Sequence, residues 1–128
     1  MIVLDTSLLV DALTGPRRSA PALRAAIVDG HRLLLPSLVL YEWLRGPRQR
    51  EELEAQEALL PREHALPFGA EEAAVAAKLY GDASRSRGRE VDLAIAASAI
   101  VQGAALWTLN VRDFEGIPNL QLYDGSAP

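Results

Sequence analysis

Four acidic residues stand where carboxylates could do chemistry, each beside or within an apolar stretch of the chain: Asp5, Glu42, Asp92 and Asp113. Carboxylates brought together repel one another, and a unit pair at 4 Å costs roughly 1 to 4 kcal/mol at effective dielectrics of 80 to 20. A hard cation offsets this repulsion. The sequence has no cysteine and its two histidines lie far apart, so an oxygen-only ligand set favours Mg²⁺ or Mn²⁺ over zinc. The chemistry that such a site serves is phosphoryl transfer, in which the ion activates water and stabilises the leaving oxygen.

Two neutral polar residues accompany these acids. Thr108 and Asn110 follow an apolar run and precede Asp113, so we expect them to orient a water molecule or an outer ligand of the ion. We expect His31 and His64, which lie beside the starts of two predicted strands, to be surface residues.

The elements that must position the acids are short buried strands separated by helices. Apolar runs predict strands at 2–4, 32–35 and 104–109, an alternating last strand at 120–123 and a short edge piece at 64–67. Apolar periodicity and Gly or Pro breaks predict helices at 8–13, 20–29, 38–45, 48–60, 70–84 and 90–102, with a turn or short helix at 110–114. Alternating strands and helices indicate a three-layer α/β/α sandwich with a short, mostly parallel central sheet. Ligands bind such sheets beyond the carboxyl ends of the strands, where we expect all four acids to converge.

A structural role is the alternative for several of these acids. Asp5 or Thr6 could simply cap the helix that follows, and Asp92 could do the same at the start of its own helix. Glu42 lies in an apolar helix, where an unpaired carboxylate is costly, but Arg45 falls on the same helix face and could pair with it. These alternatives remain open at this stage.

Length and composition limit the class of protein. At 128 residues the chain fits one domain, residues 1–128, and has 49 % hydrophobic and 23 % charged residues, as globular proteins do. Asp5 interrupts the first apolar run, which is not typical of a signal peptide, and no run approaches the ~20 apolar residues that span a membrane. We therefore expect a cytoplasmic protein.

The charge of the chain argues against a protein that coats nucleic acid. The formal net charge is −4, whereas such proteins present a basic surface. The arginines nevertheless gather at 17–18, 45–50 and 85–89. Each cluster either is a solvated surface or contacts phosphate around an acidic pocket, a role for which the planar guanidinium is suited.

The acids and their neighbours together resemble the signature of the PIN-domain family. The motifs are Asp5-Thr6-Ser7, an isolated Glu42 in an apolar helix, Asp92 followed by Ile95-Ala96-Ala97, and Thr108 followed by Asn110 and Asp113-Phe114. In order and spacing they resemble in particular the VapC toxins, the ribonuclease half of VapBC toxin–antitoxin pairs. The resemblance covers essentially the whole chain. A mild departure is Trp107-Thr108-Leu109, where the family more often has a smaller residue before the threonine and a basic one after it.

The resemblance implies a PIN-like α/β/α sandwich and an Mg²⁺- or Mn²⁺-dependent endoribonuclease that forms a homodimer and is inhibited by a small antitoxin. It implies that Asp5, Glu42 and Asp92 are the core metal ligands and that Asp113 is a more variable fourth. It further implies that Thr6 and Thr108 supply hydroxyl groups near the site and that Asn110 is a supporting polar residue.

The sequence also allows three other interpretations. A phosphatase of the haloacid-dehalogenase type would need a second aspartate two positions after the first, where this chain has Ser7. A response-regulator receiver would need a lysine after a late strand, but the only lysine, Lys78, lies within a predicted helix. A catalytically silent PIN-like interaction module is the third alternative.

Overall fold

A small parallel sheet forms the centre of the molecule. The computed structural model describes residues 1–126. Its strands are β1 (Ile2–Leu4), β2 (Leu33–Leu34) and β3 (Ala105–Trp107), in the order β2-β1-β3. Strand β1 pairs with both neighbours in parallel, with Val3 opposite Leu34 on one side and Leu106 on the other. All three residues of β1 are buried, as expected of a strand that is covered on both faces.

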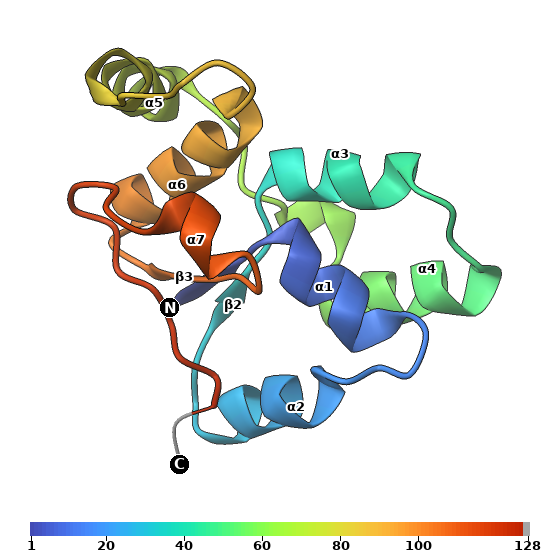
Figure 1. Cartoon of the computed structure of the whole chain (residues 1–128). Coiled ribbons are helices and arrows are strands. Elements are labelled where there is room, and N and C mark those ends of the chain that lie inside the picture. The colour runs from blue at the N-terminus through green and yellow to red at the C-terminus, as the bar shows by residue number, and fades with distance from the viewer. Residues whose placement is uncertain (127–128) are drawn as a thin grey trace.

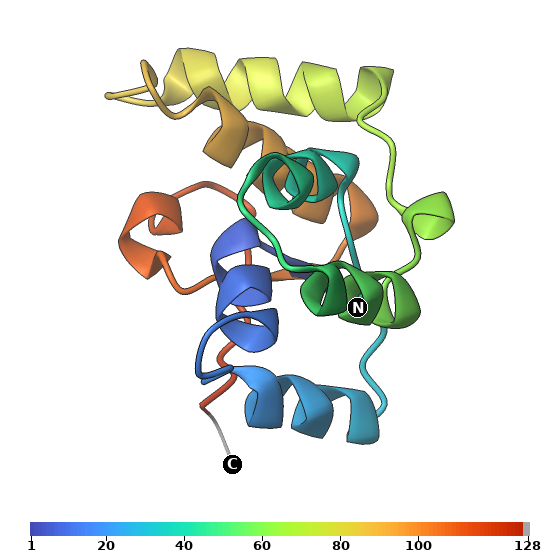
Figure 2. The ribbon, with the colours of Figure 1, turned by 90° about the vertical axis from the view of Figure 1, so that its right-hand side faces the viewer.

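Helices cover the sheet on both sides. They are α1 (Thr6–Leu13), α2 (Ala20–Val28), α3 (Ser37–Arg45), α4 (Arg50–Leu59), the short 3₁₀ helix η1 (Arg62–His64), α5 (Ala70–Asp82), α6 (Glu90–Gln102) and α7 (Val111–Phe114). Figures 1 and 2 show α2 and α5 at opposite ends of the molecule, with α1, the sheet and α6 between them. This arrangement is the predicted three-layer α/β/α sandwich.

Helix α6 packs closely because one face of it is made of small side chains. Ala96, Ala97 and Ala99 are fully buried, and Ile95 and Leu93 join the core beside them. Small residues let a helix backbone approach a sheet, and α6 contacts both β1 and β3. The helix ends at Gly103, whose φ of 65° lies in the left-handed region that glycine adopts without strain. The predicted start and end of this helix are therefore confirmed.

Two strand predictions, at 120–123 and at 64–67, are wrong. Residues 120–123 contribute only a single bridge, Leu106 to Leu122, and residues 64–67 only a bridge from Pro36 to Leu66. Proline explains the second case, because neither Pro36 nor Pro67 can donate to a ladder. His64 itself belongs to η1, as the helical turn that follows Pro61 continues through it.

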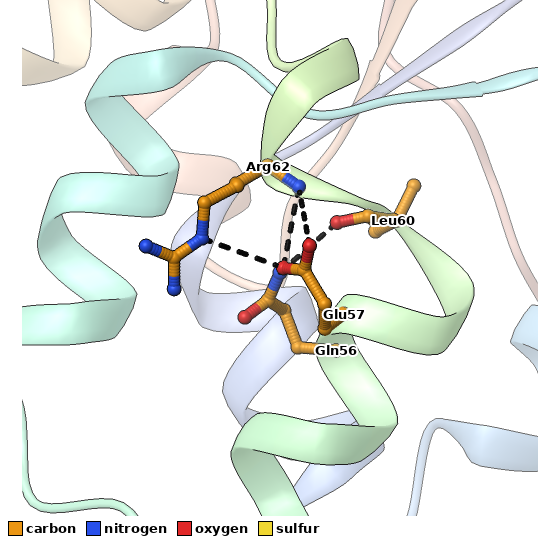
Figure 3. A network of polar contacts seen from close by, with 4 residues as sticks. All are labelled: Gln56, Glu57, Leu60 and Arg62. Atoms are coloured by element: carbon orange, nitrogen blue, oxygen red, sulfur yellow. Dashed lines mark hydrogen bonds and ion pairs between the residues drawn. The ribbon is translucent and has the colours of Figure 1, made fainter.

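The helix predicted at 48–60 is shorter at both ends in the structure. Helix α4 begins at Arg50 and not at residue 48, because the Arg48 side chain turns back, donates from Nε to the Trp43 carbonyl at 3.0 Å and stacks over the Trp43 ring. At its other end α4 stops before Pro61. Figure 3 shows the polar contacts there: the buried Gln56 donates from Nε2 to the Leu60 carbonyl at 3.0 Å, and the Glu57 carboxylate accepts from the Arg62 backbone N–H at 3.3 Å.

The helices of this fold are short. None of those within residues 1–126 is both long enough and apolar enough to cross a membrane.

Candidate active site

Asp5 is held at the carboxyl end of the central strand. Its backbone N–H donates to the Trp107 carbonyl at 2.9 Å, which continues the pairing of β1 with β3. The residue is only 4 % exposed and occupies the N-cap position of α1. Its carboxylate does not act as the cap, however: Oδ2 accepts from the Thr108 hydroxyl at 2.7 Å and from the Ser7 hydroxyl at 2.9 Å. The capping alternative for the Asp5 side chain is therefore wrong.

Thr108 and Ser7 link the two ends of the chain through this carboxylate. Each hydroxyl has one proton and donates it to Asp5, so each oxygen remains free to accept. Thr108 Oγ1 accepts from the Asn110 backbone N–H, and Ser7 Oγ accepts from the Leu109 backbone N–H, both at 3.0 Å. The contacts fix the loop after β3 against the start of α1. Ser7 was not among the predicted site residues, although its position two residues after Asp5 was a usable signal.

Asn110 takes part through its backbone. Its side chain is exposed at the N-cap of α7, and it contacts the site through its main-chain N–H, which donates to Thr108 Oγ1. The predicted role of the Asn110 amide in orienting water stays a prediction.

Glu42 reaches the site from α3 with both carboxylate oxygens engaged. Oε1 accepts from the Thr6 hydroxyl at 2.6 Å, and Oε2 lies 3.5 Å from Arg45 Nη2. The Glu42 side chain is 20 % exposed and that of Arg45 is 58 % exposed. The expected structural partner therefore exists, but an ion pair this exposed contributes only about 0–1 kcal/mol. The hydroxyl of Thr6, which the family resemblance places near the site, thus donates to Glu42.

Asp92 is subject to the charges of the other three acids. It is the third residue of α6, whose N-cap position belongs to Arg89, so the capping alternative does not explain it. Burial raises the pKa of the Asp92 carboxyl, and the nearby charges of Asp5, Asp113 and Glu42 raise it further, to about 6. Arg89 opposes this shift. The charges of the other three acids thus all act on Asp92, while the convergence of the four acids in one site stays a prediction.

Asp113 occupies the outer side of the site, on the four-residue helix α7. It is exposed, and its backbone carbonyl accepts from Arg89 Nη2 at 2.6 Å. Beneath it Phe114 is buried and anchors α7 to the core.

The donor set fits a divalent cation in its chemistry, although its side chains are not drawn into one coordination shell. Among residues 1–126, no three acidic, histidine or cysteine side chains are grouped closely enough to hold a metal ion. Glu42 is turned toward Thr6 and Arg45, and Asp113 lies at the periphery. What remains is a set of mutually repelling oxygens around a half-buried carboxyl whose pKa is raised, and a cation would relieve that repulsion.

The arginine clusters divide between structural and free positions. Arg48 stacks at 4.3 Å over Trp43, and the exposed Arg50 pairs with Glu54 at 3.4 Å. Arg17 and Arg87 are exposed and keep the phosphate-contact interpretation open. His31 and His64 are both exposed, as predicted.

The sequence matches the model of the PIN domain over residues 2–119. It is 36 % identical to Ribonuclease VapC19 of Mycobacterium tuberculosis over 128 aligned residues, which cover 94 % of this chain and 98 % of that protein. The chain belongs to the PIN-domain family, among proteins of the VapC type. The haloacid-dehalogenase and receiver interpretations are thereby set aside.

Solved structures agree with this membership. A chain of the crystal structure of VapBC2 from Rickettsia felis bound to a promoter DNA fragment superposes with a TM-score of 0.75 at 25 % identity, covering 96 % of this chain and 98 % of that one. A chain of the DNA-bound VapBC structure from Salmonella typhimurium gives a TM-score of 0.79 at 21 % identity, covering 97 % of each. The second likeness concerns the fold alone, and it extends over nearly the whole length of both chains.

Proposed function

We propose that this PIN-domain protein is the endoribonuclease toxin of a type II toxin–antitoxin pair and hydrolyses RNA phosphodiester bonds with Mg²⁺ or Mn²⁺. The proposal is supported by its likeness along nearly its full length to a protein named as a VapC ribonuclease and by its likeness to chains from VapBC complexes. We further propose that residues 1–128 act as a single PIN-like domain.

The observation that carries the proposal is the placement of the acids: Asp5 at the end of β1 accepts from the Thr108 and Ser7 hydroxyls, and the charges of Asp5, Asp113 and Glu42 all act on Asp92. A folded protein gains nothing in stability from gathering like charges around a half-buried carboxyl, so the arrangement is one expected of a functional site. It lies at the carboxyl ends of β1 and β3, the edge at which open α/β sheets bind ligands.

We assign the metal-ligand role to Asp5, Glu42, Asp92 and Asp113. A divalent ion bound there would supply activation of the attacking water and neutralisation of the charge that develops on the phosphate. Thr108 and Ser7 orient the Asp5 carboxylate, because both donate to the same oxygen. Thr6 does the same for Glu42. We assign Asn110 a supporting role beside Thr108.

The proposed partners follow from the relatives. Likeness to chains from VapBC structures supports a cognate antitoxin that covers the acidic site, and we also propose a homodimer, which the family resemblance implies. Because cellular RNA is the proposed substrate, we place the reaction in the cytoplasm.

RNA cleavage by the purified protein tests the proposal. We expect cleavage of a mixed RNA substrate with Mg²⁺ or Mn²⁺, its loss with excess EDTA, and its loss in Asp5→Asn and Asp92→Asn. Asp29→Asn removes an exposed carboxylate at the end of α2 and serves as the matched control, which should cleave like wild type. Equal cleavage by wild type and both site variants would reject the assignment.

The silent interaction module is the alternative outcome of the same experiment. It would be favoured if wild type cleaved no RNA and showed no rise in melting temperature with Mn²⁺, while still binding the protein encoded beside it. A ligand that binds only the folded state raises its stability, so Mn²⁺ bound at the site would raise the melting temperature.

A further inference from the structure

Arg89 is the one arginine that joins the two segments carrying Asp92 and Asp113. Its Nη2 donates to the Asp113 backbone carbonyl at 2.6 Å and its Nη1 to the Arg85 carbonyl at 3.2 Å. The guanidinium therefore connects the loop before α6, the start of α6 and the helix α7, which lies 24 residues further along the chain.

The backbone of Arg89 is itself anchored. Its N–H donates to the Ser86 carbonyl at 3.0 Å, and its carbonyl accepts from the Leu93 N–H at 2.9 Å in the first turn of α6. The side chain thus extends from a fixed point toward α7, a helix of only four residues. So short a helix has little stability of its own and depends on Phe114 and on contacts such as this one.

The contacts of Arg89 differ from those of Arg45 in one respect that bears on the site. Arg45 pairs with the carboxylate of Glu42, whereas Arg89 donates to the backbone carbonyls of Arg85 and Asp113. A guanidinium bound to the Asp92 or Asp113 carboxylate would compete with a cation for those oxygens. Bound to carbonyls, it places α7 beside α6 and leaves the carboxylate oxygens available.

We infer that Arg89 is a positioning residue, which holds α7 so that the Asp113 carboxylate faces Asp92 at the metal site. The inference rests on the proposed function for the identity of the site, but the contact itself does not. A planar fork can reach two carbonyls in different segments at once, whereas a lysine ammonium is a single point donor. Lysine at this position should therefore restore the function only in part.

Calorimetric titration with Mn²⁺ tests the inference without RNA. Arg89→Gln should bind Mn²⁺ about tenfold more weakly than wild type, the lower end of the effect of losing a group that orients a metal ligand. Arg89→Lys should lie between the two. Arg87→Gln removes the same charge from an exposed position two residues away and should bind Mn²⁺ like wild type. Equal affinities for the Arg89→Gln and Arg87→Gln variants would overturn the inference.

A double-mutant cycle with Asp113→Asn separates positioning from a plain charge effect. If Arg89 acts through Asp113, Arg89→Gln should weaken Mn²⁺ binding in the wild-type background and add nothing in the Asp113→Asn background. Full additivity would mean that Arg89 acts on the site by another route, and the inference would fail. In RNA cleavage, the expected change is a lower kcat with KM unchanged; a change confined to KM would make Arg89 an RNA contact and also overturn it.

Amide hydrogen exchange tests the contact between Arg89 and α7 even if the wild-type protein neither binds Mn²⁺ nor cleaves RNA. The N–H groups of Asp113 and Glu115 donate to the carbonyls of Asn110 and Val111 at 3.0 Å, and both should exchange faster in Arg89→Gln but not in Arg87→Gln. If wild type neither bound Mn²⁺ nor cleaved RNA, the proposed function would fail, while exchange would still show whether Arg89 holds α7. Unchanged exchange would overturn the inference whatever the activity.

Discussion

The two halves of the acidic site are built in different ways. Asp5 lies at the end of the central strand, is 4 % exposed and receives two hydroxyl hydrogen bonds. Asp113 is exposed on a four-residue helix that is tied to α6 through the Arg89 side chain. The inner half is fixed by the sheet and the outer half by one arginine and one buried phenylalanine. We therefore expect the inner half to tolerate no change and the outer half to be adjustable.

The largest expected effect is the difference in RNA cleavage between the Asp5 and Asp113 variants. Asp5→Asn should lower kcat/KM for RNA by more than the roughly 100-fold upper end for residues outside the ligand shell, since it removes a ligand. Asp113→Asn should cost only about tenfold, because its carboxylate is peripheral and water can replace it. Parallel cleavage assays measure the two. Equal losses would show that the two halves contribute alike.

The next effect concerns the hydroxyl that supports Asp5. Thr108→Val keeps the side-chain shape but leaves the Asn110 N–H without its acceptor and the buried Asp5 with one donor fewer. We expect the free energy of unfolding to fall by about 1–3 kcal/mol, the cost of leaving buried polar groups unsatisfied. Chemical denaturation measures it. Asn110→Ala retains the backbone contact and is the control; a comparable loss there would place the support in the amide side chain.

A smaller effect is the pH dependence of stability due to Asp92. Its pKa is raised to about 6 in the folded state from the ordinary value of 3.8, so between these values the folded state binds more protons than the unfolded state. Stability due to this group is therefore fully present below pH 3.8 and is lost as the pH rises through 6. In EDTA at pH 7, Asp92→Asn should melt higher than wild type, by roughly 4 °C for each 1 kcal/mol relieved.

The same melts at pH 4 provide the control for Asp92. There the wild-type carboxyl is largely protonated, so the two proteins should melt at closer temperatures. A variant that melts lower than wild type at both pH values would instead give Asp92 a structural role in starting α6.

The smallest effect is expected at the Glu42–Arg45 pair. Arg45→Gln should change the free energy of unfolding by no more than about 1 kcal/mol, because the arginine is more than half exposed and the pair is screened by solvent. Urea denaturation of the two proteins measures this. A loss of several kcal/mol would make the pair structural and remove Glu42 from the proposed ligands.

The inner half of the site was the more predictable one. Asp5 follows three apolar residues directly, so its place at the end of a buried strand could be predicted from neighbouring positions alone. The helix that carries Asp92 was equally clear from its small residues and the glycine that ends it. The expectation that the acids converge came from the rule that parallel strands end at one edge. Whether these acids are the metal ligands stays a prediction.

The outer half depends on contacts between distant positions, which no local pattern encodes. Nothing near Arg89 in the sequence indicates that its guanidinium reaches the Asp113 carbonyl. Similarly, residues 120–123 alternate as a strand does, but only Leu122 forms a bridge. Ser7 was not predicted to have a role at the site, whereas its hydroxyl donates to Asp5 and accepts from the Leu109 N–H.

Because the central strand precedes both of its neighbours in the chain, the order of synthesis constrains when the site can exist. Strand β1 leaves the ribosome about 100 residues before β3 and Thr108, a delay of roughly 5–20 s at typical elongation rates. Until then Asp5 has neither its strand partner nor its threonine donor. Such long-range pairing is also slow to form. A nascent chain therefore carries no assembled acidic site, and a partner made alongside it has that interval in which to be present first.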